Sequence, residues 1–296
     1  MTDIASTPTP EATASESPHP WDAAAAGWNH HAALIHNWLH DATRTMLEEA
    51  HMGPGSRVLD IAAGAGDQTL DIARLIGIQG QVLATDVSPG ILALARKNAE
   101  AEGLSQVSTQ VADAQSLGLA GANFDAAVSR LGLMFCLAPL VALSEIRAAL
   151  RPQGRFSALV FGRPENNPCL TITLATARKH AGLVSGAAAQ TPRPFEPGSL
   201  MSLGKPGLLE YLLHDAGFVN VSTRYVSAPF HTNSAEQYVD FLRSSASPMI
   251  EMLAPLPDAV RQDAWADITE QLKVFNAPSG WIGPNELLQC VAVAPQ

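Results

Sequence analysis

VLDIAAGAGDQTL, the segment from Val58 to Leu70, decides the fold of this chain. Apolar residues on both sides of Asp60 predict a buried strand, and residues 70–76 repeat at helical spacing. A strand, a glycine loop and a helix form the first unit of a nucleotide-binding α/β fold. Gly64 and Gly66 predict a tight turn with room for a ligand against the backbone, and the first N–H groups of the helix would face that ligand.

The chemistry of this loop favours a cationic ligand over a pyrophosphate. A dinucleotide loop has the pattern G-x-G-x-x-G/A, but here Thr69 holds the third position and the carboxylate of Asp60 precedes the glycines. That carboxylate would repel a pyrophosphate. It would suit S-adenosylmethionine (SAM), which carries an ammonium and a sulfonium and no phosphate. The carboxylate of Asp86, at the end of the next apolar run, can accept hydrogen bonds from both ribose hydroxyls of a ligand. NAD and SAM both carry such a ribose, so Asp86 does not distinguish them.

Several separated motifs occur in the order found in one family. Asp60 to Leu70, followed by Thr85 to Ser88, resembles motif I and the acidic strand end of class I SAM-dependent methyltransferases. The closest likeness is to the ubiquinone/menaquinone methyltransferase-like group, whose loop has the form D-x-A/G-x-G-x-G-D. The resemblance covers roughly residues 56–162. Two positions depart from the pattern: Ala62 is often Gly, and Gln153 replaces a Gly of the usual P-G-G turn.

The resemblance implies a set of cofactor contacts. It assigns Asp113 to the adenine amino group, although a loop carboxylate without this role is the plain alternative. It assigns the backbone at Arg130 to the methionine part of SAM; the alternative is that the Arg130 side chain pairs with Asp60 or with an anionic substrate. The residues assigned to the cofactor are Asp60, Ala62, Gly64, Gly66, Gln68, Asp86, Val87, Asp113, Ala114 and Arg130.

The whole chain alternates between strand and helix patterns. This order predicts an α/β fold with a doubly wound sheet and helices on both faces. The resemblance implies a mostly parallel seven-stranded, Rossmann-like sheet whose last strand is antiparallel. The expected strands are 56–62, 81–86, 107–112, 124–129, 155–161, 218–226 and 287–294, and the expected helices are 67–77, 89–102, 138–150 and 206–213.

Segments outside this alternation are expected to cover the site. We expect one methyltransferase domain over residues 21–296, with a helical lid over 21–52 and two cover insertions, over 163–205 and 234–275. Residues 1–20 are rich in Thr, Pro, Ala and Ser and predict a disordered tail. The aromatic residues of the lid would line the pocket or simply pack the helix on the core.

Composition limits the partners. The net charge of −10 argues against nucleic acid and against an anionic membrane surface. No apolar run approaches the roughly 20 residues of a membrane span. The three cysteines show no pairing pattern, which favours a reducing, cytoplasmic compartment. We expect a small-molecule substrate, and a homodimer is one option for the oligomeric state.

Candidate catalytic groups are few. His31 and His36 on the first helical segment are the candidates for a general base near the pocket. His36 and His40 share a helix face, but no third ligand is visible, so no metal site is expected. Methyl transfer needs a base only where the acceptor must lose a proton. The apolar residues 131–135 suit a partly hydrophobic acceptor and lack the Asn/Asp-Pro-Pro-Tyr of enzymes that methylate nucleobases.

Two other functions remain open at this point. An NAD(P)-dependent oxidoreductase would need a pyrophosphate loop, which Asp60 and Thr69 disfavour. A SAM-binding subunit without catalysis would keep the same loop and carboxylates. Detectable methyl transfer by the protein alone would exclude that non-catalytic subunit and indicate an enzyme that methylates oxygen, nitrogen or carbon.

Overall fold

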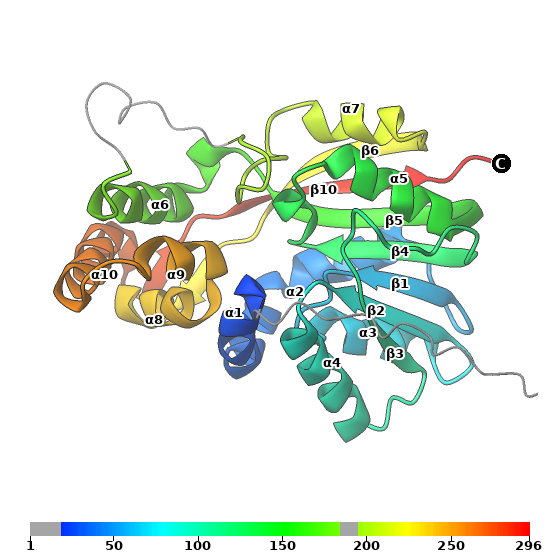
Figure 1. Cartoon of the computed structure of the whole chain (residues 1–296), viewed down its shortest axis with the longest axis horizontal. Helices are drawn as coiled ribbons and strands as arrows, with labels where there is room; N and C mark the ends of the chain where they lie inside the picture. The colour runs from blue at the N-terminus through cyan, green and yellow to red at the C-terminus, as the bar shows by residue number, and fades with distance from the viewer. Residues whose placement is uncertain (1–18, 184–194) are drawn as a thin grey trace, which may run out of the picture.

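A computed structural model describes residues 19–183 and 195–296. A seven-stranded sheet in the order β3-β2-β1-β4-β5-β10-β6 forms the centre of the molecule (Figure 1). Only β10 runs antiparallel to its neighbours, so the predicted doubly wound, mostly parallel sheet is confirmed. Its strands are β1 (Arg57–Ile61), β2 (Gln81–Asp86), β3 (Val107–Val111), β4 (Phe124–Arg130), β5 (Leu150–Phe161), β6 (Val219–Ser227) and β10 (Glu286–Val293).

Helices cover both faces of this sheet. Neighbouring helices α2 (Ala32–Glu49), α3 (Asp67–Ile76) and α4 (Pro89–Ala101) form one layer, and α5 (Pro139–Ala149) packs beside α7 (Leu208–Asp215) in another. Helix α4 begins where the sequence predicts, because the Ser88 side chain accepts a hydrogen bond from the Ile91 N–H and Pro89 occupies the first turn.

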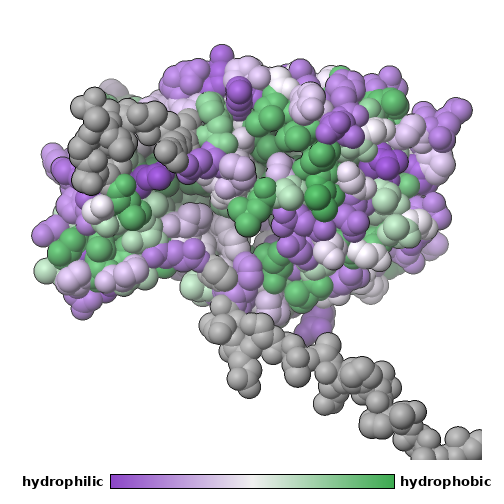
Figure 2. All heavy atoms as spheres, turned by 45° about the horizontal axis from the view of Figure 1, so that its top comes forward, coloured by the Kyte–Doolittle hydropathy of each residue, from purple (hydrophilic) through white to green (hydrophobic). Residues whose placement is uncertain are grey.

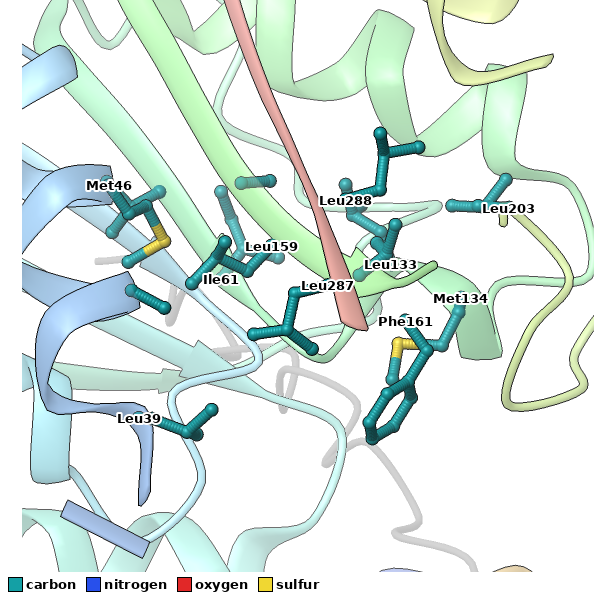
Figure 3. Close-up of a cluster of buried hydrophobic side chains, with 14 of the residues drawn as sticks. Leu39, Met46, Ile61, Leu133, Met134, Leu159, Phe161, Leu203, Leu287 and Leu288 are labelled. Atoms are coloured by element: carbon teal, nitrogen blue, oxygen red, sulfur yellow. The ribbon is translucent and has the colours of Figure 1, made fainter. Parts of the chain in front are cut away.

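The core lies between α2 and the middle of the sheet. Leu39 and Met46 of α2 point toward Ile61 of β1 and Leu287 of β10 (Figure 3). All four side chains are almost completely buried. These side chains pack α2 against β1 and β10. Elements near both ends of the described chain therefore share one core.

A group of helices stands beside the sheet. It contains α6 (Pro168–His180), α8 (Ala235–Ser245), α9 (Ser247–Leu253) and α10 (Asp258–Leu272), and it gathers at one end of the molecule in Figure 1. A small sheet, β7 (Phe230–Thr232), β9 (Gly280–Gly283) and β8 (Asn276–Ala277), lies with it. Helix α1 (Pro20–His30) contacts α4 on one side and α8 and α9 on the other.

Three expectations need correction. The segment 21–52 forms two helices, α1 and α2, which meet at His31. Strand β5 begins at Leu150 and not at residue 155, and the small sheet β7–β9 was not predicted. Of the predicted tail, residues 1–18 lie outside the described residues, as do residues 184–194 of the first cover insertion, and α1 begins at Pro20.

Apolar and polar side chains are interspersed on the face shown in Figure 2. Within residues 19–183 and 195–296, no helix combines the length and apolar character that crossing a bilayer requires.

Candidate functional site

A cavity of 380 Å³ opens at the carboxyl ends of β1, β2 and β4. Ligands of open α/β sheets bind at this edge. Helices α1 and α2 contribute its other walls. Of the residues assigned to the cofactor from the sequence, those that line it are Ala62, Gly64, Gln68, Asp86, Val87, Asp113, Ala114 and Arg130.

The floor of the cavity is formed by two strained turns. Ala62 after β1 and Leu131 after β4 both have left-handed backbone, with φ of 56° and 58°. Such backbone costs a non-glycine residue about 1–2 kcal/mol, and strain of this kind clusters at ligand sites. A Cβ at Gly132 would lie 2.3 Å from the Ala62 Cβ, so the two turns are in close contact. The φ at Ala62 explains why a glycine suits this position.

Gly64 provides the open surface of the loop. Its φ is +57°, and a Cβ there would meet only the Ile91 side chain, at 3.9 Å, within a wall of the cavity. A methyl group at Gly64 would therefore project into space that a ligand can occupy. The backbone N–H of Gly64 donates to Asp86 Oδ2 at 3.0 Å.

Two backbone N–H groups fix the Asp86 carboxylate, which can still accept hydrogen bonds from a ligand. Its Oδ1 accepts from the Ser88 N–H and its Oδ2 from the Gly64 N–H, each at 3.0 Å. Each carboxylate oxygen keeps a lone pair free after these bonds. The side chain is 8% exposed and lines the cavity. Burial raises the pKa of Asp86, against the opposing effect of the two backbone donors.

Asp60 and Gly66 lie behind the cavity wall. Asp60 is fully buried and accepts from Gln68 Nε2 at 2.6 Å and from Thr69 Oγ1 at 2.5 Å. Burial raises the pKa of Asp60 to about 6. A Cβ at Gly66 would lie 3.0 Å from the Ala95 Cβ, so this glycine permits close packing of α3 on α4. Neither residue lines the cavity, so their assignment to the cofactor stays a prediction.

The partner of Arg130 is Asp67. The guanidinium NH2 lies 2.8 Å from Asp67 Oδ2, and NH1 donates to Thr43 Oγ1 at 2.9 Å. The alternative in which Arg130 pairs with Asp60 is therefore incorrect. Asp67 also lies 3.1 Å from His36 Nδ1. The Arg130 guanidinium and the Asp67 carboxylate therefore lie side by side in the cavity wall. Their opposite charges match the ammonium and the carboxylate of a zwitterionic ligand group.

Asp113 and Ala114 lie at the other end of the cavity. Asp113 Oδ1 accepts from the Gln115 backbone N–H at 2.8 Å, and its carboxylate is also reached by Gln115 Nε2. Gln115 Oε1 in turn accepts from the Ala138 N–H at 2.7 Å. Gln115 therefore fixes the loop after β3, and no sequence motif pointed to this residue.

Neither candidate histidine lines the cavity. His31 Nε2 lies 3.1 Å from Ser244 Oγ on α8, and His36 contacts the outer side of Asp67. His19, which caps α1, does line the cavity and was missed. Among the described residues, no cluster of three or more His, Cys, Asp or Glu has the arrangement of a metal site.

Helix α1 is clasped over the cavity by Asp22. Asp22 Oδ1 accepts from the Ser88 hydroxyl and, at 3.0 Å, from the Gly90 N–H at the start of α4. On the other side of α1, Trp28 Nε1 donates to the Ser245 carbonyl at 2.9 Å. A Cβ at Gly27 would lie 1.9 Å from the Ser244 carbonyl oxygen, so a glycine is required for this approach. Helix α1 contributes Trp21 and Trp28 to the cavity wall, and the lid predicted over residues 21–52 stays a prediction.

An apolar chamber adjoins the cavity. Its volume is 70 Å³, and it lies between α1, α6, α8 and α9. Trp21, Trp28, Leu131 and Phe135 line both spaces. Its far wall contains Asn285, which precedes β10. The sequence did not predict this chamber, because its walls come from segments that are distant in the chain.

Comparison with known proteins agrees with this geometry. Residues 58–154 match the family model of a methyltransferase domain. The ubiquinone/menaquinone biosynthesis C-methyltransferase UbiE of Teredinibacter turnerae is 37% identical over 122 residues, which cover 41% of this chain and 49% of the relative. The chain therefore spans about half the length of the C-methyltransferases that it matches.

Two further relatives extend over more of the chain. The uncharacterized protein Rv1405c of Mycobacterium tuberculosis is 29% identical over 219 residues, which cover 72% of each chain. The [4+2]-cyclase SpnF has a similar structure, with a TM-score of 0.56 at 20% identity over 95% of this chain and 99% of that chain. At this identity the likeness to SpnF shows a shared fold.

Residues 58–154 are thus similar to a methyltransferase domain, and the chain shares its overall fold with SpnF. The cavity lies between the loops of this domain, at the carboxyl ends of its strands, and helices α1 and α2.

Proposed function

We propose that this protein transfers a methyl group from SAM to a small-molecule acceptor. The observation that carries the proposal is the junction of two spaces. A cavity that contains a prepared carboxylate, Asp86, shares aromatic and apolar wall residues with a chamber that has no charged lining among its described residues. This is the arrangement required to hold a polar cofactor against an apolar acceptor.

The cavity walls suggest how SAM lies. The ribose hydroxyls bind Asp86, and the adenine lies toward Asp113 and Ala114. The amino and carboxyl groups of the methionine part lie near Arg130 and Asp67, whose opposite charges match them. Asp60 contributes indirectly, by fixing Gln68 in the wall. The sulfonium methyl group then faces the border with the chamber.

Methyl transfer at the border between the cavity and the chamber depends on how the cofactor and the acceptor are aligned. The residues that line both spaces, Trp21, Trp28, Leu131 and Phe135, carry no titratable group. Orientation and exclusion of water supply on the order of 7–11 kcal/mol in well-aligned reactions, and the lid α1 serves both purposes. We infer that the acceptor presents its nucleophile without a protein base at this border, so His31 and His36 are not part of the reaction.

Other properties follow from the same proposal. The acceptor is a small molecule and not a nucleic acid, consistent with the net charge of −10. A cytoplasmic location fits Cys136, Cys169 and Cys290, all free and buried. An NAD(P) ligand is disfavoured because Asp67 opens α3 and the buried Asp60 of β1 contacts Gln68 and Thr69 in its first turn, where a pyrophosphate would bind.

The test is calorimetric titration with S-adenosylhomocysteine. We expect micromolar binding by the wild type and a loss of about 100-fold or more in Asp86→Ala, since two hydrogen bonds to a charged group are removed. Gly64→Ala should weaken binding about tenfold or more by filling the cavity. Gly55→Ala is the matched control, because Gly55 also has positive φ, at +83°, but nothing lies within 4 Å of its Cβ position.

NADH is the competing ligand to be titrated in the same experiment. Binding of NADH without binding of S-adenosylhomocysteine would overturn the proposal. Tight binding of S-adenosylhomocysteine without methyl transfer to any acceptor would favour a SAM-binding protein without that activity.

A further inference from the structure

A groove lies at the opposite edge of the sheet from the cofactor cavity. It has a volume of 440 Å³ and is formed by the end of α2, the loop before β1, and the amino-terminal parts of β4 and β5. It shares no lining residue with the cofactor cavity or with the apolar chamber. The proposed methyl transfer therefore gives this groove no role.

Two residues that line the groove have a backbone conformation that glycine adopts more easily. Among the described residues, six that are not glycine have positive φ. Two of the six are asparagines, which tolerate this conformation, and two, Ala62 and Leu131, line the cofactor cavity. The remaining two are His51, with φ of 50°, and Gln153, with φ of 63°, and both line the groove.

Contacts within the protein do not explain the strain at His51 and Gln153. Both side chains are exposed, and neither makes a side-chain hydrogen bond to any residue within 19–183 or 195–296. His51 follows the C-cap of α2, and Gln153 stands in place of a glycine of the P-G-G turn. Glycine would suit both positions at lower cost. Strain of this kind clusters at ligand sites, and here both strained residues bring N–H donors to one groove.

The groove also contains an arginine without an acidic partner. Arg155 is half-buried, and its NH1 donates to the Glu49 carbonyl at 3.2 Å. In the part of the chain that the structure describes, Arg155 forms no ion pair with a carboxylate. Its positive charge therefore remains uncompensated in the groove wall, although the whole chain has a net charge of −10.

The one carboxylate among the described lining residues of the groove is already paired. Asp125 Oδ2 accepts from the Arg57 backbone N–H at 2.8 Å, and Asp125 Oδ1 accepts from Arg151 Nε at 2.6 Å. Arg151 therefore balances the charge of Asp125, and the charge of Arg155 is left over. The groove favours an anion that accepts charge-assisted hydrogen bonds.

We propose that this groove binds a phosphate group, either as the free ion or as part of a small phosphate ester. Arg155 supplies the charge, and Gln153, His51 and the Ser56 hydroxyl supply N–H and O–H donors. Ser56 Oγ accepts from the Gly53 N–H at 3.0 Å, so its own proton is free to donate. Donors from three segments of the chain suit a tetrahedral oxyanion more than a planar carboxylate. This inference does not depend on the proposed methyl transfer.

The test is an NMR titration of the full chain with inorganic phosphate at constant ionic strength, because salt screens exposed charges. The backbone amide signals of His51, Ser56 and Gln153 should shift and saturate, and acetate should bind about tenfold more weakly. Glycerol 3-phosphate distinguishes the two sources of the phosphate group: tighter binding than inorganic phosphate indicates an ester, and equal or weaker binding indicates the free ion. Acetate that binds as tightly as phosphate, or shifts that never saturate, would overturn the proposal.

Gln153→Gly separates ligand binding from a structural role. The glycine relieves the strained backbone, so the melting temperature should stay level or rise. Phosphate should bind about threefold more weakly, because a donor to a charged group is lost. A lower melting temperature with unchanged phosphate affinity would show that Gln153 serves only the turn, and would overturn the proposal.

Arg155→Gln tests the role of the charge, and Arg96→Gln is its matched control. Arg155→Gln should weaken phosphate binding about tenfold. Arg96 is an exposed arginine of α4 outside the groove, so its loss should leave the phosphate affinity at the wild-type value. Equal losses in the two variants would overturn the proposal, since phosphate would then respond only to the overall charge.

Failure of this inference is separable from failure of the proposed function. Gln153→Gly and Arg155→Gln should bind S-adenosylhomocysteine with wild-type affinity, since neither residue lines the cofactor cavity. A wild type that does not bind S-adenosylhomocysteine overturns the proposed function, whereas the phosphate titration still tests the groove.

Discussion

At the scale of single residues, Asp60 combines complete burial with two hydrogen-bond donors and a nearby cation. Burial outweighs the donors Thr69 and Gln68 and the charge of Arg130, so the pKa rises from 3.8 to about 6. The folded protein therefore binds more protons than the unfolded chain between about pH 4 and 6, and the free energy of unfolding falls as pH rises through this window.

This coupling gives a prediction for Asp60→Asn. The unfolding free energy of the wild type, relative to the variant, should decrease by roughly 2.4 kcal/mol between pH 4 and pH 7, at about 1.4 kcal/mol for each pKa unit over the full titration. Urea unfolding at a series of pH values measures it. Asp41→Asn is the control, because the Asp41 side chain is 89% exposed. Parallel curves for wild type and Asp60→Asn would contradict the assigned pKa.

The residue scale also shows how far the sequence could predict the site. The glycine loop and Asp86 were identifiable because their spacing reflects local backbone requirements. The sequence did not reveal that Asp60 binds Gln68 and Thr69 behind the cavity wall, since a loop pattern does not specify the partners of its side chains. The Arg130–Asp67 pair depends on the relative positions of β4 and α3, which only the folded sheet defines.

At the scale of elements, a clasp holds α1 against the start of α4 beside the cavity. Asp22 makes hydrogen bonds to Ser88 and Gly90 across the two helices. In Asp22→Ala we expect amide hydrogen exchange in α1 to quicken about tenfold, because losing these bonds lowers the free energy of opening by about 1–2 kcal/mol. S-adenosylhomocysteine should also dissociate faster.

The control for the clasp is Asp41→Ala, which removes an exposed carboxylate from α2. Exchange in α1 should keep its wild-type rate in this variant. Equal exchange rates in Asp22→Ala and the wild type would show that α1 is held by its contacts with α8 alone.

Elements with strong local patterns were predicted well, and elements defined by tertiary contact were not. The alternation from β1 to β5 follows apolar periodicity, and α4 carries an explicit cap at Ser88. The break between α1 and α2 has no such signal, because His31 makes no side-chain cap there. Strands β7 to β9 are two to four residues long, too short for a periodic pattern.

At the scale of the whole molecule, the sheet and the helical group meet around two joined spaces. Trp28 and Trp38 connect the N-terminal helices to residues near positions 228 and 245, across about 200 residues of chain. Such long-range contacts build the chamber, so local sequence patterns predict the cofactor loop but not the acceptor site. We predict that SAM binds in one orientation relative to the cavity and the chamber.

The most direct test of the account is a crystal structure with bound SAM. The account predicts the ribose hydroxyls on Asp86, the methionine part beside Arg130, and the sulfonium methyl group at the border formed by Trp28 and Phe135. A SAM molecule bound elsewhere, or one whose methyl group faces away from the chamber, would contradict the central claim.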